Sequence, residues 1–456
     1  MSVKSNDKTY LFESMPVPKA VSTMAIPTII GQLIVLIYSM ADTFFIGRTN
    51  NPYMVAAASL ILPLFNMALP LGAISGVGGA TLISRLMGEG KSEDAGKVYS
   101  FCVYLSILFG ILFSAGVFIG MKPLLGALGA NEQTFSFARS YALCVIVIGG
   151  IPTILTNVFA GMARAIGESK KAGFGVTMGG IINIFLDPLF MFVLLPEGNE
   201  ILGAGIATAL SNFITCIYFI VVIRKLKNTS VLKLNKLTLF PEFKNIKLIF
   251  AIGVPSAVAT LLFDLDYIVL DKLMSHHGDI ALASIGIVLK AERLPLNIGI
   301  GICQGMVPIV AYNFASGNFK RMKEVSGFSL KCGIICAIIS ITLYEIFAPY
   351  ILKFFIDEPQ TIALGTNFLR IRCLATIFMF LSFYHVHLFN GYCRGKEALF
   401  LGVMRWAVFN IPMLFILNRF FGMYGLVWSQ ISADILTVIL SFAVHRRYMK
   451  NNKMIQ

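Results

Sequence analysis

Apolar runs long enough to cross a lipid bilayer recur along almost the whole chain. A membrane-spanning helix needs about 20 mostly apolar residues. In lipid the backbone polar groups must find their partners within the helix itself, so such runs dictate the fold. We therefore predict an all-α membrane protein with twelve transmembrane helices. The candidate spans lie near residues 20–47, 53–86, 96–121, 134–164, 171–195, 202–224, 247–275, 281–313, 325–353, 361–393, 397–419 and 422–445.

The composition agrees with a membrane location. Charged residues occupy only 13% of the 456 positions, whereas a soluble domain carries roughly 25%. A net charge of +14 would suggest nucleic acid as a partner of a soluble protein. Here the basic residues form short clusters between apolar runs, as in cytoplasmic loops. We expect the lipid bilayer as a partner and no nucleic acid.

The loop charges predict the orientation. Basic clusters follow every second span, such as Arg85 with Lys91 after the second and Arg164 with Lys170 after the fourth. The opposite loops are poor in basic residues, as at 196–200. By the positive-inside rule both termini face the cytoplasm of a multi-pass protein. The predicted segments are a cytoplasmic N-terminal segment 1–19, a first lobe 20–224 with helices 1 to 6, a cytoplasmic linker 225–246, a second lobe 247–445 with helices 7 to 12, and a basic cytoplasmic tail 446–456.

Three landmarks of the first half recur in the second half at nearly one offset. Each half contains six spans, so both halves start on the same side of the membrane. We therefore predict two pseudo-symmetric six-helix bundles that form a parallel repeat, and such repeats commonly hold a substrate site between them. The matching positions are Pro27 and Pro255 (255 − 27 = 228), Gly90 and Gly317 (317 − 90 = 227), and Gly161 and Gly391 (391 − 161 = 230).

Four polar side chains lie at similar depth inside spans of the first half, namely Asp42, Asn183, Asp187 and Thr208. From the rise of an α-helix we place Asp42, Thr208 and Asp187 about 8, 9 and 12 Å below the outer helix ends, and Asn183 lies one turn from Asp187 on the same helix face. A charge at the centre of a membrane helix costs about 2.5–3.5 kcal/mol. Their oxygen atoms suit a hard cation such as Na⁺, and two close buried carboxylates also share a proton readily. The alternative is structural: Asp42 caps a helix end and Asp187 satisfies a kink at Pro188.

The second half has its own polar residues within apolar runs. Asp264 and Asp266 are two positions apart and cannot share a helix face. Glu292 can form a structural ion pair with a neighbouring base, Arg293 or Lys290. For each of these residues a structural role and a role in cation binding both stay open. The secondary candidates are Asp264, Asp266, Glu292, His385 and Asp434, and a histidine among them can titrate near neutral pH.

Several motifs together resemble the multidrug and toxic compound extrusion (MATE) family, in its DinF-like branch with the MepA-type bacterial exporters. The resemblance extends from about Pro27 to Trp428. It implies a V-shaped MATE fold in the bacterial inner membrane. It also implies export of amphipathic, often cationic compounds, driven by entry of H⁺ or Na⁺. The motifs are residues 76–81 through 88–90, 163–167, 183–188, and 304–308 through 312–313.

The resemblance also implies roles for single residues. In that branch the cation site falls on the four positions that depth and chemistry select, Asp42, Asn183, Asp187 and Thr208. It adds Gln32, Tyr38 and Asn157 as residues that line the cavity, and Pro27 as a hinge of the first helix. One departure concerns the second half: Asp264 resembles an acidic position of the NorM branch, whereas Phe383 replaces that branch's acid in helix 10. A cation site in the second lobe stays an open alternative.

We predict a secondary active multidrug exporter that antiports small organic molecules against H⁺ or Na⁺. The alternative is a flippase for a lipid-linked sugar, from the wider superfamily. Such flippases usually carry several cationic residues in the cavity, whereas the first-lobe helices carry acids and almost no bases. The chain has no Walker motif and no Cys-x-x-Cys pair. We expect no enzyme activity, no cofactor beyond the coupling ion, and a monomer.

Overall fold

A computed structural model describes residues 9–226, 230–233 and 241–452. Parts of the predicted N-terminal segment 1–19, linker 225–246 and tail 446–456 therefore lie outside the described residues. Every regular element in the described part is a helix, which confirms the all-α prediction. The chain forms two compact units. The first contains Met1–Met15 and Ile26–Ala257, and the second contains Pro16–Ala25 and Val258–Gln456.

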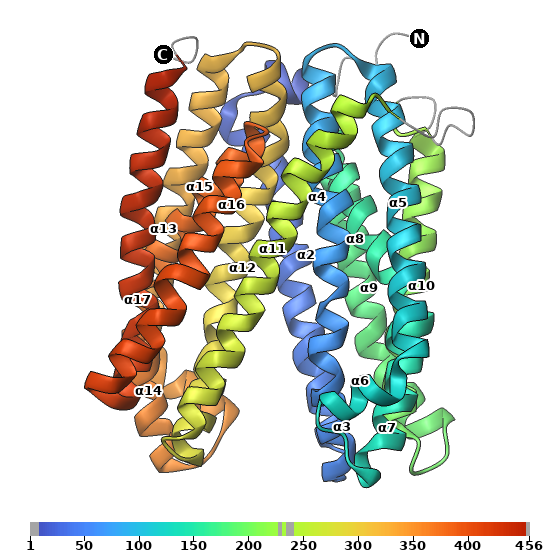
Figure 1. The fold of residues 1–456 in the computed structure, drawn as a ribbon, viewed down its shortest axis with the longest axis vertical. Helices are drawn as coiled ribbons and strands as arrows, with labels where there is room; N and C mark the ends of the chain where they lie inside the picture. Colours follow the sequence, from blue (N-terminus) through green and yellow to red (C-terminus); the bar gives the residue numbers. More distant parts are fainter. Residues whose placement is uncertain (1–8, 227–229, 234–240, 453–456) are drawn as a thin grey trace. The chain divides into compact units, whose positions relative to one another are not determined.

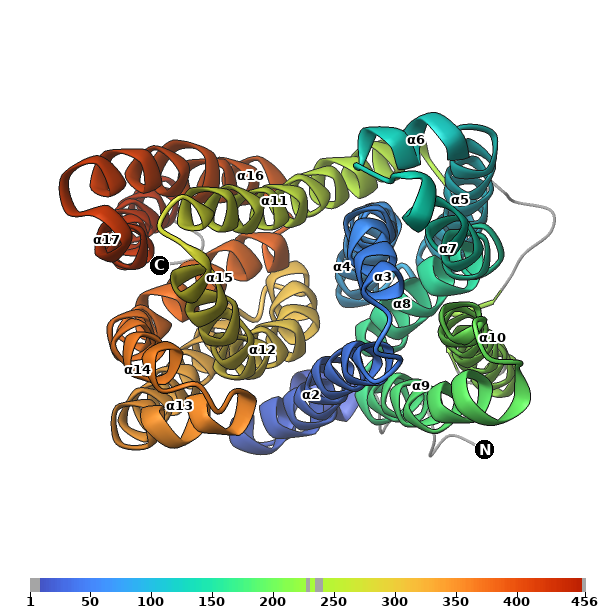
Figure 2. The ribbon, with the colours of Figure 1, turned by 90° about the horizontal axis from the view of Figure 1, so that it is seen from below.

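The first unit is a bundle of long helices around α8, which packs against α4, α5, α9 and α10 (Figures 1 and 2). Its glycine-rich and alanine-rich helices allow this close packing, as is common in membranes. Its elements are α2 (Val17–Gly47), α3 (Pro52–Asn66), α4 (Ala68–Gly88), α5 (Ser92–Ile119), α6 (Met121–Ala127), α7 (Glu132–Ala142), η1 (Leu143–Ile148), α8 (Gly150–Ala165), α9 (Ser169–Leu189), η2 (Phe190–Leu194) and α10 (Glu200–Leu226).

The second unit is built around α12, which packs against α13, α14 and α15. Its elements are the later part of α11 (Phe243–Ser275), α12 (Asp279–Ala315), α13 (Phe319–Phe355), α14 (Pro359–Cys373), α15 (Thr376–Gly391), α16 (Gly395–Val403), η3 (Met404–Asn410) and α17 (Ile411–Asn451).

The helices account for twelve spans in the described residues. Nine stretches are long and apolar enough to cross a membrane, and two bent helix pairs raise the number to eleven. One of the nine, Gly395–Asn451, has 57 residues and would extend about 85 Å as one helix, against a hydrocarbon core of about 30 Å. It breaks at Gly422, whose φ of 58° and ψ of −140° are not helical. The break makes it two spans, so 11 + 1 = 12.

The bent spans occupy equivalent places in the two halves. Glu132–Ile148 meets Gly150–Ala165 at 45°, and Pro359–Cys373 meets Thr376–Gly391 at 44°. The first bend is explained locally, because Pro152 follows it and a proline lacks the N–H that would continue the helix ladder. No proline lies at the second bend, so the two bends share a place in the repeat rather than a common local cause.

The first helix of each half changes from one unit to the other part-way along its length. In α2 the change falls between Ala25 and Ile26, and in α11 between Ala257 and Val258. Pro27 and Pro255 lie within two or three residues of these points. Both helices continue through their prolines. The two prolines of the predicted repeat therefore lie at equivalent positions, each close to the point where its helix passes from one unit to the other.

Candidate functional site

Close contact between α2 and α9 prepares the polar cluster of the first unit. A Cβ atom added at Gly180 would lie 2.6 Å from Ile34 Cγ2 and 3.2 Å from Tyr38 Cδ1, and one at Gly173 would overlap the carbonyl of Pro27. The two glycines are seven residues apart and therefore lie on one face of α9. Their missing side chains let α2 approach the turn of α9 that carries Asn183.

Three of the predicted cation ligands lie together. The amide Nδ2 of Asn183 donates a hydrogen bond to Asp187 Oδ1 at 3.2 Å and another to Thr208 Oγ1 at 3.4 Å. Asn183 and Asp187 are one turn apart on α9, and Thr208 comes from α10. All three are buried, with Asp187 0% exposed. The amide of Asn183 thus links the carboxylate of Asp187 on α9 to the hydroxyl of Thr208 on α10.

Asp42 is the fourth predicted ligand, and it lies close to the other three. Its charge acts on Asp187, and both carboxylates act on Tyr38. Its Oδ2 accepts a hydrogen bond from the hydroxyl of Tyr141 at 3.4 Å. Asp42 lies inside α2, whose last residue is Gly47, and not at the helix end where a cap would sit.

The two carboxylates lack a basic partner. Among the described residues neither Asp42 nor Asp187 forms an ion pair with lysine or arginine. Asp42 Oδ1, Asp187 Oδ2 and Asn183 Oδ1 are also buried with no hydrogen-bond partner. Leaving a buried polar atom unsatisfied costs about 1–3 kcal/mol, and more for a charged group. Three such oxygens from three side chains can together ligate a monovalent cation or take up a proton.

The remaining predicted residues differ in their burial and in their contacts. Tyr38 belongs to it through its packing on α9. Gln32 is half-buried on α2, six residues earlier. Asn157 is exposed on α8 and directs its amide to the carbonyl of Thr153 in the same helix. Pro27 lies in an unbroken stretch of α2.

The sequence analysis missed Tyr141. Its hydroxyl reaches Asp42 across 99 positions of sequence, from α7. The available signal was a tyrosine inside the fourth apolar span, since a buried tyrosine hydroxyl usually finds a polar partner. Its contact with Asp42 adds a hydrogen-bond donor to a cluster otherwise made of carboxylates, an amide and a hydroxyl.

A second polar network lies inside the second unit and contains two buried ion pairs. Arg372 donates to Glu292 Oε2 from Nε at 3.0 Å and from Nη2 at 2.8 Å. Arg405 Nε donates to Asp434 Oδ1 at 2.7 Å. The sequence analysis expected Arg293 or Lys290 as the partner of Glu292, and this was wrong. Adjacent residues on a helix point to different sides, and the actual partner comes from α14.

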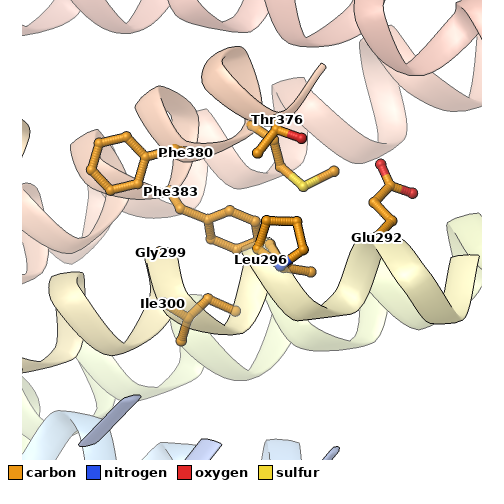
Figure 3. Close-up of a pocket in the computed structure, with 9 residues that line it drawn as sticks. Glu292, Leu296, Gly299, Ile300, Thr376, Phe380 and Phe383 are labelled. Carbon is orange, nitrogen blue, oxygen red and sulfur yellow. The ribbon is translucent and has the colours of Figure 1, made fainter. Parts of the chain in front are cut away.

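A pocket between α12 and α15 borders this network (Figure 3). Leu296, Phe380 and Phe383 form much of its apolar wall, and Glu292 and Thr376 add polar groups. The centroid of the Phe383 ring lies 4.4 Å from the guanidinium carbon of Arg405, which is the geometry of a cation–π contact.

The other secondary candidates differ in their surroundings. Asp266 is 2% exposed and accepts a hydrogen bond from Asn410 Nδ2 at 2.8 Å. Asp264, two positions earlier on α11, is half-buried. His385 bonds through Nδ1 to the carbonyl of Leu381 at 2.8 Å and packs against aromatic rings, including Phe442 at 4.7 Å.

Comparison with known families locates the same repeat. Residues 27–189 and 255–416 each match the family model described as MatE. The two matches begin 255 − 27 = 228 positions apart, which is the offset of the proline pair. The internal repeat inferred from three landmarks is thus confirmed by two copies of one family pattern.

Individual relatives cover the chain almost completely. The multidrug export protein MepA of Staphylococcus aureus is 30% identical over 440 residues, which are 96% of this chain and 96% of that protein. MepA of Staphylococcus haemolyticus is 29% identical over 439 residues, 96% of this chain and 95% of its own.

Solved structures show the same fold. A MATE protein in complex with MaL6 superposes with a TM-score of 0.92 at 21% identity, over 99% of this chain and 100% of that one. An outward-facing multidrug resistance MATE family transporter of the MOP superfamily gives 0.91 at 21% identity, over 98% of each chain.

Proposed function

The chain belongs to the MatE family of membrane transporters, and on that premise we propose that it exports amphipathic or cationic organic compounds in exchange for H⁺ or Na⁺ by alternating access. The observation that carries the proposal is the pair of carboxylates of Asp187, which is buried, and Asp42, which is half-buried with a buried Oδ1; among the described residues neither has a basic partner. MepA, which is similar over almost the whole chain, is named as a multidrug export protein. That name supports the same broad role here.

The chemistry of the cluster suits exchange. Asp42 and Asp187 attract a positively charged cargo as long as they are ionised, because opposite charges in a medium of low dielectric interact strongly. A proton or a sodium ion at the same oxygens cancels that attraction. Cargo and coupling ion therefore compete for one negative charge, and uptake of one favours release of the other.

The roles of the single residues follow from this scheme. Asp42 and Asp187 bind the coupling cation, and the oxygens of Asn183 and Thr208 complete its shell. The cargo path runs past residues that can stack or hydrogen-bond, and Pro27 acts as a hinge in α2. Both termini lie in the cytoplasm, and segments 20–224 and 247–445 act as the two lobes. The cargo path is assigned to Gln32, Tyr38 and Asn157.

The cluster is less suited to the alternative, a flippase for a lipid-linked sugar. Holding a pyrophosphate needs cationic side chains that are free to pair with it. In the second unit, Arg372 and Arg405 are each already bonded to a carboxylate. The acidic pair Asp42 and Asp187 in the first unit and the neutralised arginines of the second unit favour a cationic cargo.

The decisive experiment is efflux of a cationic dye, such as ethidium, from vesicles that contain the purified protein. A pH gradient and a Na⁺ gradient are imposed separately, and an uncoupler or a Na⁺ ionophore then collapses each. Exchange is supported if one gradient drives dye movement and the matching ionophore stops it. Dye movement that ignores both gradients would contradict antiport.

A further inference from the structure

Five buried charged side chains in the second unit act on one another, and their charges do not balance. The acids are Asp266, Glu292 and Asp434, and the bases are Arg372 and Arg405; each is 2% exposed or less. Both arginines act electrostatically on Asp266 and on Glu292. If all five were ionised, the network would carry 3 − 2 = 1 excess negative charge. An excess charge in the protein interior is costly, and arginine does not give up its proton.

The guanidinium contacts show which acid is left over. Both oxygens of Asp434 have donors, Arg405 Nε and Gln430 Nε2, each at 2.7 Å. Glu292 accepts two hydrogen bonds from Arg372 through Oε2, although its Oε1 is buried with no partner. Among the described residues Asp266 forms no ion pair with a guanidinium group. Its Oδ2 accepts one amide hydrogen bond from Asn410, and its Oδ1 is buried with no partner.

We propose that Asp266 holds an exchangeable proton on Oδ1, and that it forms a second proton site in the second unit, separate from the Asp42 and Asp187 cluster. Adding one proton to this carboxylate removes the excess charge and leaves both ion pairs intact. The carbonyl oxygen of the Asn410 side chain is also buried and without a partner. It supplies a hydrogen-bond acceptor on the side chain that already bonds Asp266.

A proton fits this place better than a metal cation. Sodium needs several oxygen ligands, and the described residues contain no group of three or more His, Cys, Asp or Glu side chains that could hold a metal ion. A metal ion would also lie near two guanidinium groups. A proton needs only one oxygen and adds no coordination shell.

Several elements bring charged or polar groups to the network of Asp266, and of these Arg372, Arg405, Asp434 and Asn410 act on Asp266 itself. α12 brings Glu292, α14 brings Arg372, and η3 brings Arg405 with Asn410. α17 brings Gln430 and Asp434, and Tyr267 is the neighbour on α11. The use of this proton in transport rests on the proposed function, whereas the charge balance of the five buried side chains does not depend on that function.

The test is infrared spectroscopy of the purified full chain in lipid, with the C=O band of a protonated carboxylic acid as the readout. Spectra in H₂O and D₂O are compared for wild type, Asp266→Asn and the matched control Asp264→Asn, over a range of pH. We expect Asp266→Asn to lose the signal of one protonated carboxyl per chain, and Asp264→Asn to keep it. An unchanged band in Asp266→Asn would overturn the proposal, and so would the loss of the Asp266-dependent band on adding Na⁺ at constant pH to the double variant Asp42→Asn, Asp187→Asn.

Two further variants separate this site from its alternatives. Asp434→Asn removes one negative charge, so Asp266 should ionise and the band should vanish although Asp266 is still present. Persistence of the Asp266 band in a folded Asp434→Asn protein would contradict the charge balance. If the Asp434→Asn protein does not fold, the comparison of Asp266→Asn with wild type still tests whether Asp266 is protonated. In the double variant Asp42→Asn, Asp187→Asn the Asp266 band should remain even when transport is lost. The test of the Asp266 proton is therefore independent of the test of the proposed transport function.

Discussion

Asp42 combines a buried carboxylate with a position inside α2, where it has only a tyrosine hydroxyl as hydrogen-bond partner. Asp42→Asn removes the charge and keeps the size, so we predict that dye export falls to the level of empty vesicles while the amount of protein in the membrane is unchanged. The matched control is Glu197→Gln, an exposed loop position, which should export normally. Near-normal drug resistance in cells that carry Asp42→Asn would exclude this residue from the mechanism.

The pair of Arg372 and Glu292 allows a stability prediction. Arg372→Met leaves Glu292 buried without a counter-charge, and breaking a buried pair in this way costs about 3–5 kcal/mol. We expect a clearly lower thermal unfolding temperature in detergent. The double variant Arg372→Met, Glu292→Gln removes both charges and should recover most of the loss. A double variant that is destabilised by the sum of the Arg372→Met and Glu292→Gln losses would show that the two side chains contribute independently.

Single-residue chemistry could be predicted from the sequence only where the residue was itself unusual. Asp42 and Asp187 were found because a carboxylate in an apolar run is costly wherever its partner lies. The partners of buried acids could not be derived from the sequence. The contact of Tyr141 with Asp42 spans 99 positions, and the contact of Arg372 with Glu292 spans 80. Which helix faces which acid depends on packing, and local spacing contains no information about it.

At the scale of helices, glycines decide where two elements can touch. A Cβ atom at Gly253 of α11 would overlap the backbone of Ile74 in α4, whereas Gly116 of α5 has no atom within 4 Å of such a Cβ. We predict that Gly253→Ala destabilises the protein by about 1–3 kcal/mol through overpacking. Gly116→Ala should stabilise it by about 0.5–1 kcal/mol. Thermal unfolding of both variants tests this, and a tolerated Gly253→Ala would mean that α4 and α11 can separate there.

Helix boundaries were partly predictable for a physical reason. The break at Gly422 falls on the first residue of the predicted span 422–445, just after the predicted span 397–419, because two full spans cannot fit in one membrane crossing. The bend between α14 and α15 had no such signal. It lacks a proline, and only its equivalent in the first half, near Gly149, reveals it as part of the repeat.

At the scale of the molecule, the repeat gives each half one helix that belongs to both units. The start of α2 packs in the second unit, where a Cβ atom at Gly305 would lie 2.8 Å from Ala25 Cα. The start of α11 packs in the first unit, where Gly253 contacts Ile74. Each of these two helices therefore has one part packed in each unit, and Pro27 and Pro255 lie close to the change.

The last prediction concerns the competition between cargo and coupling ion. If Asp42 and Asp187 bind the ion, its binding removes the charge that attracts a cationic cargo, so the two affinities are linked reciprocally. Coupling between linked sites is typically about 1–3 kcal/mol, or roughly 5–150-fold in affinity. The affinity for ethidium, measured by fluorescence on the purified protein, should fall as protons or Na⁺ fill the site.

Variants identify the carboxylates responsible for this linkage. Asp42→Asn and Asp187→Asn should bind the dye more weakly, with an affinity that changes little with the coupling ion, because the titrating charge is gone or reduced. Glu197→Gln should follow the wild type. A wild-type affinity that depends on neither pH nor Na⁺ would mean that the cluster is structural and that the driving ion binds elsewhere. In that case Asp266, whose proton is argued from a separate charge balance, becomes the first residue to test for coupling.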